Sequence, residues 1–105
     1  MGMANLQRMA MQMQQEMERI QAELAATMVE GTAGGGVVRA VVTGKQEFVS
    51  ITIEPDVVDP ADVEMLQDLV TAAVKEALDA SRRVAGQKMA AVTAMTGGLG
   101  GLLGR

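Results

Sequence analysis

Between Ala4 and Thr27 the chain has neither glycine nor proline, and its apolar residues recur at alternating steps of four and three. This spacing puts them on one side of an α-helix, and it is also the spacing of a coiled-coil seam. We therefore predict a helix over about residues 4–27 whose apolar side packs on strands or on a partner helix, with methionine filling irregular gaps. The predicted seam consists of Leu6, Ala10, Met13, Met17, Ile20 and Leu24.

The middle of the chain has the composition of β-strands. Glycines at 34–36 and at 44 separate three short segments, at about residues 28–32, 37–43 and 48–53, and this order predicts a three-stranded antiparallel sheet. The third segment alternates apolar and polar residues, so its side chains should divide between two faces. One face is predicted to carry Val49, Ile51 and Ile53, and the other Phe48, Ser50 and Thr52.

The second strand is apolar on both faces, which predicts a helix on one face and another cover on the other. Hydrophobic residues make up 49% of a chain of only 105 residues, more than one small core readily hides. We therefore expect a homodimer, the alternative being a monomer with a methionine-rich core. The sequence leaves open which face of the sheet meets the partner. The expected contact residues are Val38, Ala40, Val42, Val49, Ile51 and Ile53.

The C-terminal third is predicted to be one long helix. Pro55 ends the last strand, and Asp59-Pro60 is typical of a helix N-cap followed by proline at the first helical position. A helix over about residues 60–95 extends roughly 50 Å, so its second half should project from the domain. The expected architecture is α+β, a single domain over residues 1–96 with two long helices, followed by a flexible Gly/Leu tail over residues 97–105.

Charge is unevenly distributed along this acidic chain, whose net charge is -4. Residues 47–79 carry nine acids and one lysine, whereas residues 80–105 carry four basic residues and no acid. Two sets of polar side chains on the helices are therefore candidates for contacts with DNA phosphates. Ion pairs of Arg19 with Glu16 or Glu23, and of Arg83 with Asp79, are the competing explanation. The candidate DNA-binding residues are Arg8, Gln12, Gln15 and Arg19 on the first helix and Arg82, Arg83 and Lys88 on the last.

Several function classes are excluded by composition. The chain has no histidine or cysteine, so it lacks the commonest general base, a thiolate nucleophile and zinc-thiolate ligands. The acids between Glu54 and Glu64 do not have the spacing of a calcium loop and suit a helix start better. We expect no enzymatic activity, no metal, no cofactor and no small-molecule substrate. With no apolar run of about 20 residues and no secretory signal, we also expect no membrane association and a cytoplasmic location.

Motifs spread over nearly the whole chain resemble the YbaB/EbfC family of bacterial nucleoid-associated proteins. They are the Met/Gln-rich helix with Met9, Met11, Met13, Gln14 and Met17, the segments 34–40 and 53–73, the Gly44 turn, Lys88-Met89, and 95–99. The resemblance implies an α-β-β-β-α chain with a short helical turn before the last helix, and a tweezer-like homodimer. It also implies double-stranded DNA as partner, bound by the helical arms, and effects on nucleoid organisation and gene expression.

The family has no invariant DNA-contact motif, so the candidate residues rest on charge and position. Because phosphate neutralisation dominates non-specific affinity, few basic residues predict modest DNA binding that is mainly to the backbone. The alternative is a helical protein-interaction module, with no direct DNA role, whose projecting helices present Met and Leu to another protein.

Overall fold

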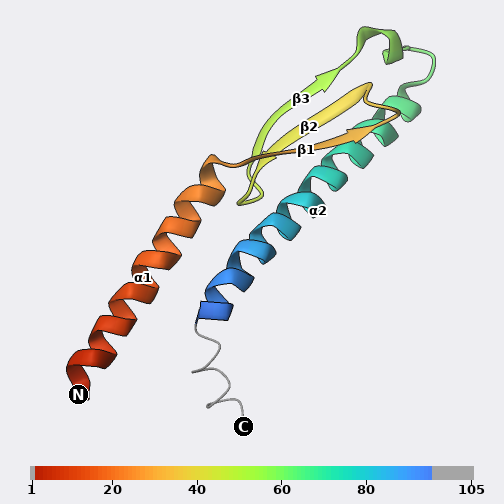
Figure 1. Ribbon diagram of the computed structural model, residues 1–105. Helices are drawn as coiled ribbons and strands as arrows, with labels where there is room; N and C mark the ends of the chain where they lie inside the picture. Colours follow the sequence, from red (N-terminus) through yellow and green to blue (C-terminus); the bar gives the residue numbers. More distant parts are fainter. Residues whose placement is uncertain (1, 96–105) are drawn as a thin grey trace.

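The first helix extends from one end of a small sheet, and the last helix runs along the sheet and continues beside the first helix (Figure 1). The computed structural model describes residues 2–95. Its elements are α1 (Met3–Ala26), β1 (Met28–Ala33), β2 (Val38–Thr43), β3 (Phe48–Ile53), the 3-10 turn η1 (Pro55–Val57) and α2 (Val63–Met95). The α-β-β-β-α order is as predicted, and η1 is the short helical turn implied by the family resemblance. The Gly/Leu tail at 97–105 lies outside the described residues.

The sheet is antiparallel throughout, in the order β1-β2-β3. The N-terminal half of α2 packs on β1 and β2, which encloses a core of small side chains. Val38, Ala40 and Val42 are completely buried there, opposite Ala73 and Ala77. Small residues on both elements let the helix lie close to the strands, and this close approach aligns α2 with the sheet.

The other face of the sheet is polar. Val41 pairs with Glu30 on one side and with Ser50 on the other, and paired residues of antiparallel strands share a face. Polar neighbours therefore surround the one apolar residue that this strand carries on that face, and a second cover over it stays a prediction.

A β-bulge changes the alternation predicted for β3. Val41 pairs with Ser50, but the next residue, Val42, pairs with Phe48, so Val49 is extra. Phe48 therefore lies on the face of Val42, whereas Ser50 lies on the face of Val41. The prediction that Phe48 shares a face with Ser50 is wrong, because an inserted residue shifts the period of the strand.

The start of α2 also differs from the prediction. The Asp59 carboxylate accepts the backbone N–H of Ala61 at 2.9 Å, which closes a turn and caps no helix. The helix begins at Val63, and Asp62 accepts the N–H of Met65 at 3.2 Å. Asp62 is therefore the N-cap, three residues later than predicted, because its carboxylate reaches an otherwise unpaired N–H of the first helical turn.

The C-terminal half of α2 packs antiparallel against α1. Ile20 and Leu24 of α1 form a second buried cluster with Val92 of α2. Across this contact the Lys88 ammonium donates to the Glu23 carboxylate at 3.1 Å. The C-terminal part of the predicted α1 seam, at Ile20 and Leu24, thus packs on α2 of the same chain. Neither described helix has an apolar stretch long enough to cross a membrane.

A buried hydrogen-bond network joins the β2–β3 hairpin to α2. The Ser81 hydroxyl, fully buried, donates to the Thr43 carbonyl at 2.7 Å and accepts the Gln46 side-chain amide at 2.9 Å. Gln46 is held at a positive φ of 61° in the turn. The network fixes the turn beside the point where α1 ends, because the Gly44 N–H donates to the Leu24 carbonyl at 2.9 Å.

Candidate nucleic-acid interface

The four α1 residues predicted to contact DNA lie on one exposed face. Arg8, Gln12, Gln15 and Arg19 follow one another at steps of four, three and four, and all are exposed. At 3.6 residues per turn this face lies about 130° around the helix from Ile20 and Leu24, which α2 covers. Packing of the helix pair therefore leaves the Arg/Gln face open along the whole arm.

Arg19 is already bound within the chain. Its guanidinium donates to the carboxylates of Glu16 and Glu23, one turn away on either side. The hydrogen bond from Arg19 lowers the pKa of Glu16, and Glu16 in turn raises the pKa of Arg19. Because Glu23 also accepts Lys88, one carboxylate connects two of the predicted DNA-binding cations. This cluster ties α1 to α2 and leaves these cations fewer donors for phosphate.

The basic residues of α2 do not share one face. Arg82 and Arg83 are exposed and adjacent, about 100° apart around the helix, whereas Lys88 turns towards α1. Asp79 pairs with Arg82 at 3.1 Å, so the expected pair of Asp79 with Arg83 is wrong: the carboxylate takes the i,i+3 partner. Within residues 2–95, Arg8 and Arg83 are candidate cations without an ion pair.

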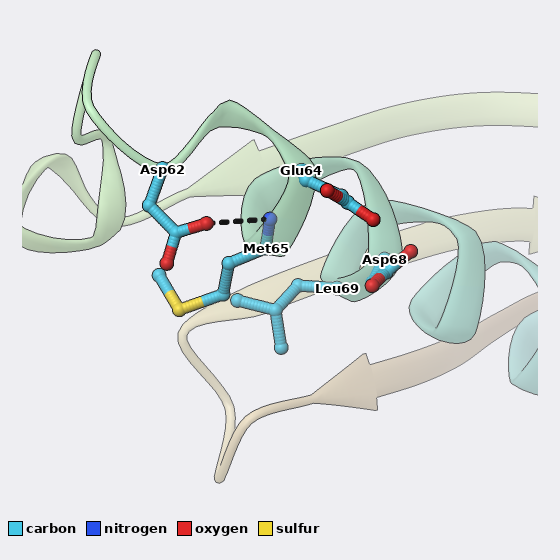
Figure 2. A pocket seen from close by; sticks show the side chains of 5 residues that line it. All are labelled: Asp62, Glu64, Met65, Asp68 and Leu69. Carbon is cyan, nitrogen blue, oxygen red and sulfur yellow. Dashed lines mark hydrogen bonds between the residues drawn. The ribbon is translucent and has the colours of Figure 1, made fainter.

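Carboxylates gather at the far end of α2, beyond the sheet. A shallow cavity of about 360 Å³ is lined by Asp62, Glu64, Met65, Asp68 and Leu69 (Figure 2). Within the described chain no three acids come close enough together to hold a metal ion. Their negative charge repels phosphate, so this end of the molecule is unsuited to DNA.

The residues expected at a dimer contact fall into two groups. The first group is Val38, Ala40 and Val42, which lie in the chain's own core. Their side chains have no exposed surface that a partner could contact. On β3, an edge strand, Val49 is 47% and Ile51 36% exposed, and Ile53 is half-buried. Sequence reasoning missed Phe48, which is 59% exposed on this side. We call Phe48, Val49 and Ile51 the β3 patch.

The signal for Phe48 was weak. It is the only aromatic residue of the chain and stands at the start of a strand beside a charged residue, Glu47. Strict alternation would have assigned it to the opposite face, and only the bulge brings it to the apolar side.

Comparison with known proteins identifies the class. A profile of the YbaB/EbfC DNA-binding family matches residues 1–97, and the chain belongs to this family. It is 50% identical over 102 residues to a nucleoid-associated protein of Chloroflexus aurantiacus, covering 97% of this chain and 99% of the relative. A nucleoid-associated protein of Acetivibrio thermocellus is 52% identical over 100 residues, covering 95% and 86%.

A solved structure supports the fold. The crystal structure of an uncharacterized protein of Helicobacter pylori superposes with a TM-score of 0.73 over 90% of this chain and 98% of that one. The two sequences are 21% identical, so this likeness concerns the fold alone. Neither the family description nor the names of the relatives indicate a catalytic activity.

Proposed function

We propose that this chain is a nucleoid-associated protein that binds double-stranded DNA as a homodimer, mainly through backbone phosphates. The observation that carries the proposal is the arrangement of charge in a DNA-binding family member: Arg8 and Arg83, which have no ion pair among the described residues, lie on the helical arms, and Asp62, Glu64 and Asp68 lie at the other end. Contacts to phosphate position a protein without reading bases, so sequence preference is weak or follows DNA shape.

The proposed cellular role follows that of the relatives. They are named nucleoid-associated proteins, which supports a location on the nucleoid. The proposal extends, as the family resemblance implies, to a cytoplasmic location and to effects on DNA conformation, nucleoid organisation and gene expression. The proposed activity is binding only, with no catalysis, no cofactor, no small-molecule substrate and no membrane partner.

Titration of a DNA duplex with the full chain at two salt concentrations tests DNA binding. Each neutralised phosphate contributes about -0.9 to the slope of log affinity against log salt. Two unpaired arginines on each of two subunits predict a slope of about -4 and modest affinity. The absence of binding at low salt would contradict the proposal. A stoichiometric protein partner whose capture nuclease does not affect would then favour the protein-interaction alternative.

The dimer is proposed to form through the β3 patch. The chain is extended, with a radius of gyration of 20.1 Å where a compact domain of this size has about 13 Å, so little of its apolar surface is covered by its own fold. The patch borders the core and lies on an edge strand, whose free N–H and C=O groups suit pairing with another strand.

Sedimentation equilibrium of an Ile51→Glu variant tests this interface. Burial of an unpaired carboxylate is costly, so we expect the dissociation constant of the dimer to rise at least about a hundredfold above that of the unchanged chain. Val58→Glu is the matched control, because Val58 is exposed outside the sheet. Equal dissociation constants for the Ile51→Glu and Val58→Glu dimers would show that the interface does not include the β3 patch.

A further inference from the structure

The turn between β2 and β3 holds a strained residue. Among residues 2–95, Gln46 is the one residue other than glycine with a positive φ, at 61°. This left-handed conformation costs glycine little, whereas a side chain strains it, and such strain persists only where the surrounding structure holds the residue in place. The Gln46 side chain therefore contributes something that glycine could not. We call residues 44–47 the β2–β3 turn.

The Gln46 side chain ties this turn to α2. Its amide Nε2 donates to the Gly44 carbonyl and to the Ser81 hydroxyl, both at 2.9 Å. Ser81 is fully buried, and its single hydroxyl proton goes to the Thr43 carbonyl at 2.7 Å, so the hydroxyl oxygen needs a donor from another residue. Gln46 is that donor, from 35 residues away in the sequence.

The same turn also contacts the end of α1. The Gly44 N–H donates to the carbonyls of Leu24 and Thr27, both at 2.9 Å. A Cβ atom at position 44 would lie 2.8 Å from the Leu24 carbonyl oxygen and 3.1 Å from the Leu24 Cα, so the turn lies directly against the α1 backbone. The β2–β3 turn is therefore fixed to α2 through Gln46 and to the last turn of α1 through Gly44.

These contacts lie where the helical arm, the pair formed by α1 and the C-terminal half of α2, leaves the sheet (Figure 1). The sheet and α2 enclose one cluster of buried residues, and α1 and α2 enclose another. α2 belongs to both clusters, whereas α1 belongs to the second alone. The core of the sheet therefore does not fix the direction of α1. The hydrogen bonds of the β2–β3 turn, with the chain connection at Thr27, hold the end of α1 against the sheet.

We propose that Gln46 is a positioning residue for DNA binding, because its bond to Ser81 holds the β2–β3 turn in place and so sets the angle between the arm and the sheet. The inference rests on the proposed function, in which arm residues such as Arg8 meet phosphate. In a dimer formed through β3, the spacing of the two arms follows from that angle. An arm held at a fixed angle needs no ordering when DNA binds, which favours affinity.

A Gln46→Gly variant tests whether the side chain fixes the arm. Glycine adopts the positive φ without strain, so the urea midpoint should stay close to that of the unchanged chain although the hydrogen bonds are lost. The chain has no cysteine, so Gln14→Cys on the arm and Thr71→Cys on α2 beside the sheet, both exposed, accept spin labels. Double electron–electron resonance, with an excess of unlabelled chain, should show a distance distribution at least about twofold broader than without the Gln46 change.

Two further variants make the distance measurement specific. Gln46→Asn tolerates the positive φ but is one methylene shorter, so it should broaden the distribution as glycine does. Ser50→Ala removes an exposed hydroxyl of the same hairpin that forms no hydrogen bond within residues 2–95, and it should leave the distribution unchanged. A distribution that stays narrow in both Gln46 variants would overturn the proposal, even with a lowered urea midpoint, because the side chain would then act on stability alone.

Titration of a DNA duplex tests whether the arm angle matters for binding. For Gln46→Gly we expect an affinity about threefold lower or more, with the slope of log affinity against log salt unchanged, because every cation remains. A changed slope, or an unchanged affinity with a broadened distribution, would overturn the positioning role. If the unchanged chain bound no duplex, the proposed function would fail, and the distances alone would decide whether Gln46 fixes the arm.

Discussion

Gly31→Ala is expected to destabilise the protein strongly. A Cβ atom at this position of β1 would lie 2.2 Å from the Ala77 nitrogen and 2.4 Å from the Ala73 carbonyl oxygen. Both are backbone atoms of α2, so relief requires the helix to move away from the sheet and to open the core. We expect a loss of about 3 kcal/mol in the free energy of unfolding, measured by urea denaturation.

Gly86→Ala is the matched control for this prediction. Gly86 lies inside α2, where an added Cβ meets no atom within 4 Å. Alanine is the better helix former, so this substitution should stabilise the protein by about 1 kcal/mol. If the Gly31→Ala variant unfolded at the same urea concentration as the unchanged chain, the contact between β1 and α2 would be looser than described.

Arg8→Ala combined with Arg83→Ala is expected to remove most of the affinity for duplex DNA. These two arginines have no ion pair in the described chain, so their donors are free for phosphate. With both lost from each of two subunits, the salt slope should fall by about 3 to 4, and low-salt affinity should fall on the order of tenfold or more. Fluorescence anisotropy of a labelled duplex over a salt series measures both quantities.

Arg19→Ala combined with Arg82→Ala provides the control, because it lowers the net charge by the same amount. These arginines form ion pairs with Glu16, Glu23 and Asp79. The Arg19→Ala/Arg82→Ala variant should therefore retain most of the slope of log DNA affinity against log salt concentration. Equal losses in the two double variants would mean that overall charge, rather than the unpaired arginines, governs binding.

Local patterns in the sequence predicted most of the fold. The seam of α1 repeats within a helical turn, the strands are separated by glycines, and α2 lacks proline after its start, so each element depends on neighbours in sequence. The exposure of Arg8, Gln12, Gln15 and Arg19 also follows from helical spacing alone. The sequence was a poorer guide to which arginines are unpaired, because Asp79 had two partners within reach, Arg82 and Arg83.

Local sequence patterns therefore predict the type and order of the elements and the face on which each residue of a helix lies. Which apolar residues the chain buries for itself depends on tertiary contacts, since Val38, Ala40 and Val42 meet α2, from which β3 and η1 separate them in the sequence. The tertiary structure also decided that Lys88 binds Glu23, 65 residues away, and that Phe48 turns to the apolar side at a bulge. These outcomes depend on close packing between distant segments, and no local pattern encodes the geometry of that packing.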